Sequence, residues 1–138
     1  GIMDGRGVAA VLILGAAGAQ LGTAFLTCKE SGIPSKWKDR LKSTAETDTR
    51  VTRLFSGRSA RGLVNEFMER LRASEQTVPD YPIQNALTGE IRQAAKRLDR
   101  LDYVALWAGQ GVPLVRSLTA TELFQRLSEE TDSSLCRA

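Results

Sequence analysis

The sequence contains no histidine among its 138 residues. This absence excludes a histidine general base and histidine metal ligation within the chain, two of the commonest routes to enzyme chemistry and metal binding. Cysteine is also scarce, with only Cys28 and Cys136 present. Two cysteines make neither a disulfide framework nor a zinc site, and their number is typical of a reduced, intracellular protein. We therefore predict no metal site and a cytoplasmic location.

Long hydrophobic runs are missing too. No stretch of ~18 consecutive apolar residues is present, so we expect no membrane-spanning segment. The apolar start lacks the basic region of a signal peptide and is interrupted by glycines, which favours a buried helix and strand. The formal net charge is only +3, from 19 basic and 16 acidic residues spread along the chain. This balance argues against nucleic-acid binding.

The glycine-rich first 25 residues hold the strongest local pattern. Asp4 is a good N-cap for a helix over about residues 5–14, which Gly15 would end. The run 18–22 is too brief for a helix and follows small turn residues, so we predict a buried parallel strand there. The sequence thus predicts a helix and a strand in succession, as in an α/β fold.

The turn at Gly22-Thr23 is a natural place to hold a phosphate. A backbone N–H beside glycine is uncovered, and threonine adds a hydroxyl donor. Gly1 supplies a second such position. In α/β barrels a phosphate is often bound between the loops after the last two strands, and Gly1 and Gly22-Thr23 flank one helix and one strand as that requires. Taken alone, such glycine turns are more often tight connections than cofactor sites.

The rest of the chain is mostly helical in pattern. We expect helices at four places, over about residues 35–45, 63–72, 90–98 and from a capping box at 119–122 to a frayed tail at 133–138. A short hairpin is expected from residues 49–55 and 60–62, joined by a turn at 56–58. The expected inward-facing positions of these helices include Trp37, Leu41, Phe67, Met68, Leu71, Ile91, Ala95, Leu98, Leu123, Phe124 and Leu127.

Two loop residues are candidates for lining a ligand pocket. Tyr81 is held extended by the proline that follows it, and Gln110 lies between two glycines in a break between helical segments. Simpler interpretations stay open for both residues. Tyr81 fits a loop tyrosine with a solvated hydroxyl, and the Gly-Gln-Gly segment fits a plain connection between helices.

Taken in order, the motifs resemble those of the FMN-dependent nitronate monooxygenases, formerly called 2-nitropropane dioxygenases. The resemblance extends over nearly the whole chain. The residues that carry it are Gly1-Ile2, Asp4-Gly5-Arg6-Gly7, Ala9-Ala10, Leu14-Gly15-Ala16, Gly18, Gln20, Gly22-Thr23, Phe25, Phe55-Ser56-Gly57-Arg58, Ala60-Arg61-Gly62-Leu63, Tyr81-Pro82 and Trp107-Ala108-Gly109-Gln110-Gly111.

The resemblance implies an α/β fold, the C-terminal part of a TIM (β/α)8 barrel followed by a mostly helical extension. A complete barrel needs ~250 residues, so this chain would be a fragment of one. The chain also opens inside what the family has as a double-glycine loop. We expect residues 1–46 to form the terminal βα units of an incomplete FMN-binding barrel. Residues 47–138 would form a hairpin and helical extension that packs on the barrel.

The resemblance also implies the site. Gly1 and the quartet Gln20, Leu21, Gly22 and Thr23 would contact FMN, mainly its phosphate. The histidine associated with catalysis in the family lies upstream of this chain, so no catalytic residue is assigned here. The implied reaction is oxidation of small alkyl nitronates with FMN and dioxygen, in which the cofactor does the hard chemistry. We expect the isolated chain to be inactive.

Other functions stay open. One subgroup of the family has a further Tyr and a Lys at four-residue intervals after the Tyr-Pro that matches Tyr81-Pro82, where this chain has Asn85 and Gly89. This departure leaves room for an FMN-dependent enoyl-acyl-carrier-protein reductase or an NADH:quinone reductase of the same barrel family. The alternative from a different class is a non-enzymatic helical interaction module.

Overall fold

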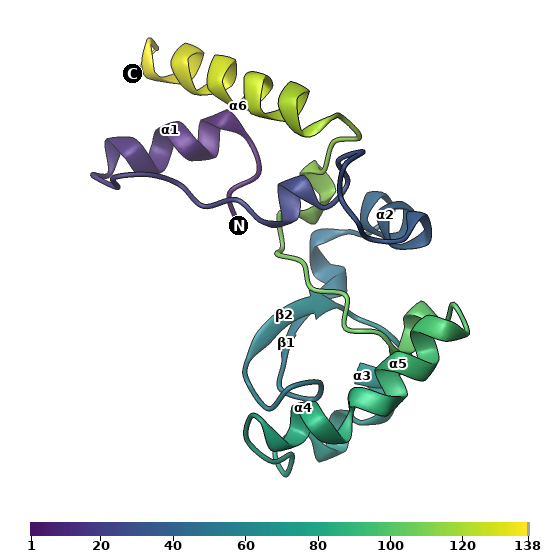
Figure 1. The fold of residues 1–138 in the computed structure, drawn as a ribbon. Helices are drawn as coiled ribbons and strands as arrows, with labels where there is room; N and C mark the ends of the chain where they lie inside the picture. Colours follow the sequence, from purple (N-terminus) through teal and green to yellow (C-terminus); the bar gives the residue numbers. More distant parts are fainter. Residues whose placement is uncertain (138) are drawn as a thin grey trace. The chain divides into compact units, whose positions relative to one another are not determined.

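The structure, a computed structural model, describes residues 1–137, which divide into two compact units. Figure 1 shows the elements of both. The first unit, residues 1–46 and 110–137, holds the helices α1 (Gly5–Ile13), α2 (Ser35–Lys42) and α6 (Ala120–Leu135) and the 3-10 helices η1 (Thr23–Phe25) and η5 (Val112–Leu114). The second, residues 47–109, holds the strands β1 (Thr49–Thr52) and β2 (Ala60–Leu63), the helices α3 (Glu66–Arg70), α4 (Ile83–Leu87) and α5 (Gly89–Arg97), and the 3-10 helices η3 (Arg72–Ser74) and η4 (Leu101–Tyr103). A further 3-10 helix, η2 (Glu46–Asp48), lies at the boundary.

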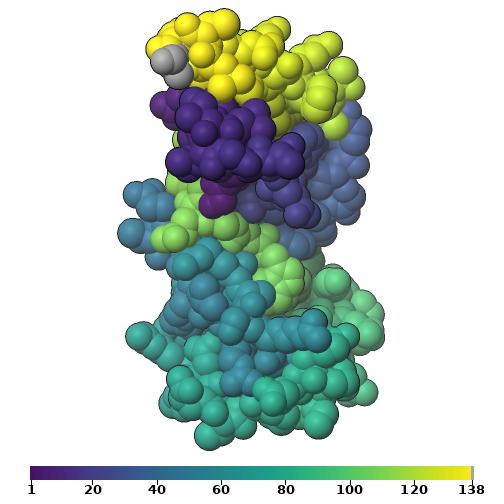
Figure 2. Space-filling view, turned by 90° about the vertical axis from the view of Figure 1, so that its left-hand side faces the viewer, coloured from purple at the N-terminus to yellow at the C-terminus, as the bar shows by residue number. Residues whose placement is uncertain are grey.

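Residues 110–137 group with residues 1–46 because α6 packs along α1. Figure 2 shows α6 in yellow lying directly against α1 in purple. The buried side chains of Met3, Leu123 and Leu127 form an apolar cluster with Ala24 of η1 and with Cys28, which follows it. The division of the sequence into residues 1–46 and 47–138 stays a prediction for the intact protein.

The local signals at the helix ends are confirmed. The Asp4 carboxylate accepts a hydrogen bond from the Gly7 N–H at 2.9 Å and caps α1. Gly15 has a φ of +94°, a conformation that glycine adopts without strain, and α1 ends just before it. Thr119 and Glu122 form the predicted capping box at the start of α6.

The predicted strand over residues 18–22 is absent. This segment is irregular chain, and the N–H groups of residues 19–22 have no hydrogen-bond partner within the described part of the protein. A strand exists only where a neighbouring strand pairs with its backbone. Among residues 1–137 the sheet consists of β1 and β2 alone, so the run has nothing to pair with.

The predicted hairpin is confirmed. β1 and β2 pair antiparallel, with Thr49 opposite Leu63. Beneath the hairpin, the Phe55 and Phe67 rings stack at 4.6 Å between centroids and Trp107 meets Phe55 edge-on. The core of the second unit is the buried cluster of Leu54, Phe55, Phe67 and Met68, against which Trp107 packs.

The helix α4 was not predicted from the sequence. It has five residues, and its apolar side chains, Ile83 and Leu87, are exposed. Buried polar side chains hold it instead. The Gln84 amide donates to the Leu54 carbonyl at 2.6 Å, and the Thr88 hydroxyl donates to the Phe55 carbonyl at 2.5 Å. Such tertiary hydrogen bonds leave no periodic apolar pattern in the sequence.

Replacing Gln84 with Leu is expected to destabilise the protein by about 1–3 kcal/mol, because the Leu54 carbonyl would stay buried without its donor. Urea denaturation of the full-length protein measures this loss. The matched control is Gln93→Leu on the exposed face of α5, for which we expect a change within about 0.5 kcal/mol. Equal effects of the two substitutions would contradict the assigned role of Gln84.

Several predicted helix details are corrected. α3 begins only after Asn65, whose side chain caps it, since the Val64 N–H pairs with the Asp48 carbonyl. Three side chains expected to face inward are exposed: Ile91, Leu98 and Phe124. The tail predicted to fray at 133–138 is helical through residue 135, and Ala138 lies outside the described residues. None of the helices within residues 1–137 is long and apolar enough to cross a membrane.

Candidate functional site

The structure brings three of the candidate segments together. A Cβ atom built on Gly111 would lie 3.0 Å from the Gly1 carbonyl oxygen and 2.4 Å from the Met3 side chain, so the segment with Gln110 lies directly against the first residues. η5 begins at the next residue and packs against η1, which follows Gly22. Gly1, Gln110 and Gly22-Thr23 therefore surround one small region of the first unit.

This region is open and offers hydrogen-bond donors. A Cβ atom on Gly1 or on Gly22 would meet no other atom within 4 Å. Both glycines and Gln20 are exposed, whereas Leu21 and Thr23 are half-buried. The free N–H groups of residues 19–22 lie in the same segment. Uncovered N–H groups beside glycine suit an anionic oxygen, so the residues present fit a phosphate group.

Tyr81 belongs to the second unit. Its side chain is 48% exposed, and the Arg58 guanidinium lies 4.5 Å from the centre of its ring. Four residues on, the Asn85 side-chain and backbone oxygens both accept hydrogen bonds from Arg92 at 2.8 Å. The Arg92 side chain therefore binds both oxygens of Asn85, and the structure does not bring Tyr81 together with the candidate residues of the first unit.

An apolar groove of about 540 Å³ runs along the first unit between α1, the irregular segment 18–21 and α6. Leu12, Leu21 and Phe25 line it. The Phe124 side chain, which is 68% exposed, lies at this groove, and this explains why an apolar residue of α6 does not face the core. The groove therefore places apolar side chains beside Gln20 and Leu21.

A charged cluster joins the start of α1 to α6. Glu130 accepts a hydrogen bond from the Gly5 N–H at 3.0 Å, and the Arg116 guanidinium donates to both Glu130 oxygens at 2.8 and 3.2 Å. Burial raises the pKa of Glu130, but the hydrogen bonds from Arg116 and Gly5 outweigh this effect and the pKa is lowered overall. The hydrogen bond from Gly7 is the main cause that lowers the pKa of Asp4, with Arg6 adding to it.

Sequence reasoning missed this cluster. Gly5 and Glu130 are 125 positions apart, and no local pattern links them. Within residues 1–137 the structure holds no group of three or more His, Cys, Asp or Glu side chains that could bind a metal ion. The charged side chains of the cluster pair with one another and with the backbone.

Comparison with known proteins identifies the family. A family model described as nitronate monooxygenase matches residues 1–130. The chain belongs to the nitronate monooxygenase family. A probable nitronate monooxygenase of Staphylococcus haemolyticus is 45% identical over 135 residues, which are 98% of this chain and 38% of the relative. One of Staphylococcus saprophyticus is 41% identical over 137 residues, which are 99% of this chain and 39% of the relative.

Solved structures agree with this family membership. The nitroalkane oxidase of Streptomyces ansochromogenes superposes with a TM-score of 0.89 at 43% identity, covering 99% of this chain and 39% of that protein. FabK of Thermotoga maritima superposes with a TM-score of 0.80 at 25% identity, covering 99% of this chain and 43% of that protein. The relatives are enzymes, and the chain spans about two fifths of their length.

Proposed function

We propose that the protein carrying this chain is an FMN-dependent nitronate monooxygenase, and that this chain supplies one edge of its phosphate-binding site. The observation that carries the proposal is that one segment contacts both regions: Gly111 lies against the Gly1 segment, and η5, which follows it, packs against η1. Both turns are open and uncovered, as a bound phosphate requires. Family membership over residues 1–130 favours this enzyme over a non-enzymatic helical module.

The residues proposed to contact FMN are Gly1, Gln20, Leu21, Gly22 and Thr23. The N–H group of Gly22, at the end of this segment, is free to donate to a phosphate oxygen, and the Thr23 hydroxyl is proposed to add a charge-assisted hydrogen bond. Gln110, exposed beside Gly1, is proposed to line the same pocket. FMN supplies the redox chemistry when bound, and these residues hold and orient it.

We also propose that residues 18–22 become a parallel strand of a TIM barrel in the intact protein, with this chain as its C-terminal part. Two observations support this proposal. The N–H groups of residues 19–21 lack partners, as in a strand whose neighbours are missing. The apolar groove beside them, lined by Leu12, Leu21 and Phe25, has the character of a surface buried by further chain.

The proposed substrates are small alkyl nitronates, with dioxygen as the electron acceptor. A second candidate is a flavin-dependent reductase of enoyl-acyl carrier protein or of quinone. Asn85 and Gly89 support this second candidate, because they stand where one subgroup of the family has a Tyr and a Lys. Asn85 is bound by Arg92, and Gly89 begins α5.

Purification of the full-length protein tests the proposal. We expect yellow protein that releases FMN on denaturation and consumes dioxygen when given an alkyl nitronate. Oxidation of NADH with an enoyl thioester or a quinone, without nitronate oxidation, would favour the reductase. A protein that neither retains nor binds FMN would contradict both assignments.

A further inference from the structure

The two turns proposed to hold the FMN phosphate are far apart in the sequence, so their relative position must be maintained by contacts elsewhere. Gly1 precedes α1, whereas Gly22-Thr23 precedes η1. Between them, the chain from residue 16 to residue 22 makes no backbone hydrogen bond to α1 other than that of Ala16 to Val11. The connecting chain alone is therefore a weak constraint on the distance between the two turns.

Glu130 holds the first turn from α6. Its carboxylate accepts from the N–H of Gly5, the first residue of α1, at 3.0 Å, while Asp4 accepts from Gly7. The Thr131 hydroxyl lies 3.3 Å from the Gly5 carbonyl oxygen, so backbone groups of Gly5 are bound on both sides by α6. The helix start that follows the Gly1 turn is therefore anchored to a side chain from the other end of the chain.

Arg116 connects the same carboxylate to the second turn. Its guanidinium binds both oxygens of Glu130, and both side chains are 28% exposed. Its backbone carbonyl accepts a hydrogen bond from the Thr27 hydroxyl at 2.8 Å. Thr27 is buried and lies four residues after Thr23, just beyond η1. Arg116 therefore contacts two regions. Its side chain binds Glu130, which holds the start of α1, and its backbone carbonyl binds the segment after η1.

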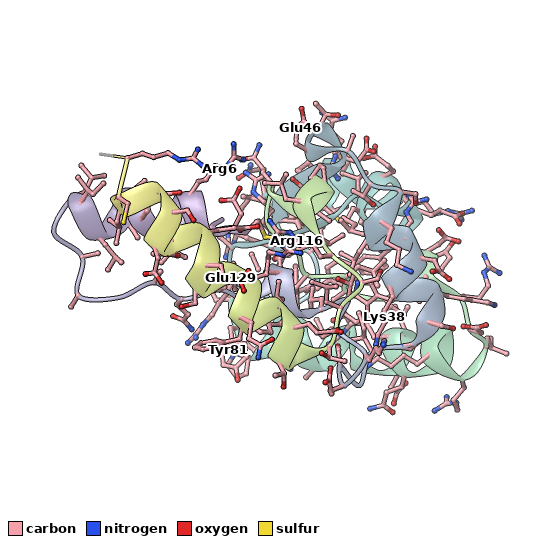
Figure 3. All side chains as sticks on the ribbon, turned by 90° about the horizontal axis from the view of Figure 1, so that it is seen from above. Arg6, Lys38, Glu46, Tyr81, Arg116 and Glu129 are labelled. Atoms are coloured by element: carbon pink, nitrogen blue, oxygen red, sulfur yellow. The ribbon has the colours of Figure 1, made fainter. Side chains whose placement is uncertain are left out.

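We propose that the Arg116–Glu130 pair is a positioning device that sets the distance between the two phosphate-binding turns. This inference rests on the proposed function. Neither side chain is proposed to touch FMN. A two-pronged Arg–carboxylate contact has a defined geometry, which makes it suited to fixing one backbone segment against another. Figure 3 shows Arg116 labelled beside α6, on which Glu129 is also labelled.

The test compares FMN with riboflavin, which has the same ring but no phosphate, in fluorescence titrations of the full-length apoprotein. Wild-type protein is expected to bind FMN more tightly than riboflavin. In Glu130→Gln, which keeps the shape but removes the charge, FMN affinity should fall on the order of ten-fold, as for other residues that orient ligand-binding groups. Riboflavin affinity should be unchanged, because only the phosphate site is displaced.

Matched variants isolate the pair. Glu129→Gln alters the neighbouring glutamate, whose side chain is 71% exposed and pairs with Arg126 of the same helix, and should change neither affinity. Arg116→Met should reproduce the loss of FMN affinity seen with Glu130→Gln. The double variant should lose no more FMN affinity than the single variant that binds FMN more weakly, because both substitutions remove the same ion pair. Arg116→Lys keeps the charge and should retain more FMN affinity than Arg116→Met.

Two results would overturn the positioning role and leave the proposed phosphate site in place. The first is unchanged FMN affinity in Glu130→Gln. The second is an equal loss of FMN and riboflavin affinity in that variant, which would indicate a general role in folding. A different result would overturn the proposed phosphate site and this inference with it. That result is a wild-type protein that binds riboflavin as tightly as FMN. The wild-type comparison therefore separates failure of the proposed function from failure of the positioning role.

Discussion

Gly5→Ala is expected to destabilise the full-length protein by about 3 kcal/mol, because the added methyl group would overlap the backbone of α6. A Cβ atom at this position would lie 2.3 Å from Glu130 Cβ and 2.5 Å from the Thr131 nitrogen. These atoms belong to a helix and cannot move aside as a flexible side-chain end can. Relief of the overlap requires α1 and α6 to separate, which would expose Ala9, the buried apolar side chain of α1.

Guanidinium or urea denaturation measures this loss as a shift of the unfolding midpoint. Gly89→Ala is the matched control, since Gly89 is also the first residue of a helix but a Cβ atom there would meet nothing within 4 Å. We expect this control to change the free energy of unfolding by no more than about 1 kcal/mol, in the stabilising direction. A Gly5→Ala protein as stable as wild type would contradict the close packing of α1 on α6.

FMN affinity is expected to fall on the order of ten-fold to a hundred-fold in Thr23→Val. Valine keeps the shape of threonine and removes one hydrogen bond to a charged acceptor, worth roughly 1.5–3 kcal/mol. Gly22→Val should lose more affinity, because its side chain would occupy the space that the phosphate approaches. We expect Gly22→Val to leave the free energy of unfolding unchanged, because a Cβ atom on Gly22 meets no neighbour within 4 Å.

The control for Gly22→Val is Gly32→Val, in which the same change is made at another open loop glycine of the first unit. It should alter neither FMN affinity nor the unfolding midpoint. Flavin fluorescence titration and thermal unfolding of the full-length protein give both quantities for each variant. If Thr23→Val bound FMN as wild type does and Gly22→Val unfolded the protein, the turn would be a packing feature and its assignment to the cofactor would be withdrawn.

The elements whose cause is local were predictable. Asp4, Gly15 and the Thr119–Glu122 capping box mark helix ends by hydrogen bonds and backbone conformations that involve residues within a few positions. The hairpin of β1 and β2 has alternating residues and a glycine turn close together in the sequence. In each case the interacting groups lie in one short segment, so the residue types alone indicate the outcome.

The candidate site was predictable in part. Gly1 and Gly22 were predicted as site residues from sequence motifs. The contacts of Gly111 with the first residues and of η5 with η1 come from tertiary packing and were not predicted. The roles of those residues in FMN binding stay a prediction. The Arg116–Glu130 pair left no sign in the sequence, because an ion pair between distant residues has no characteristic spacing.

The sequence by itself determined the family, both ends of α1, the start of α6 and the hairpin, because ordered motifs, caps and turns are properties of neighbouring residues. Only the tertiary structure decided which faces are buried and which segments meet. Residues 18–22, predicted as a strand, are unpaired, since a strand requires partners that residues 1–137 do not supply. α4 forms on buried hydrogen bonds to Leu54 and Phe55, and Phe124 points to a groove, because in both cases the deciding contacts come from residues distant in the chain.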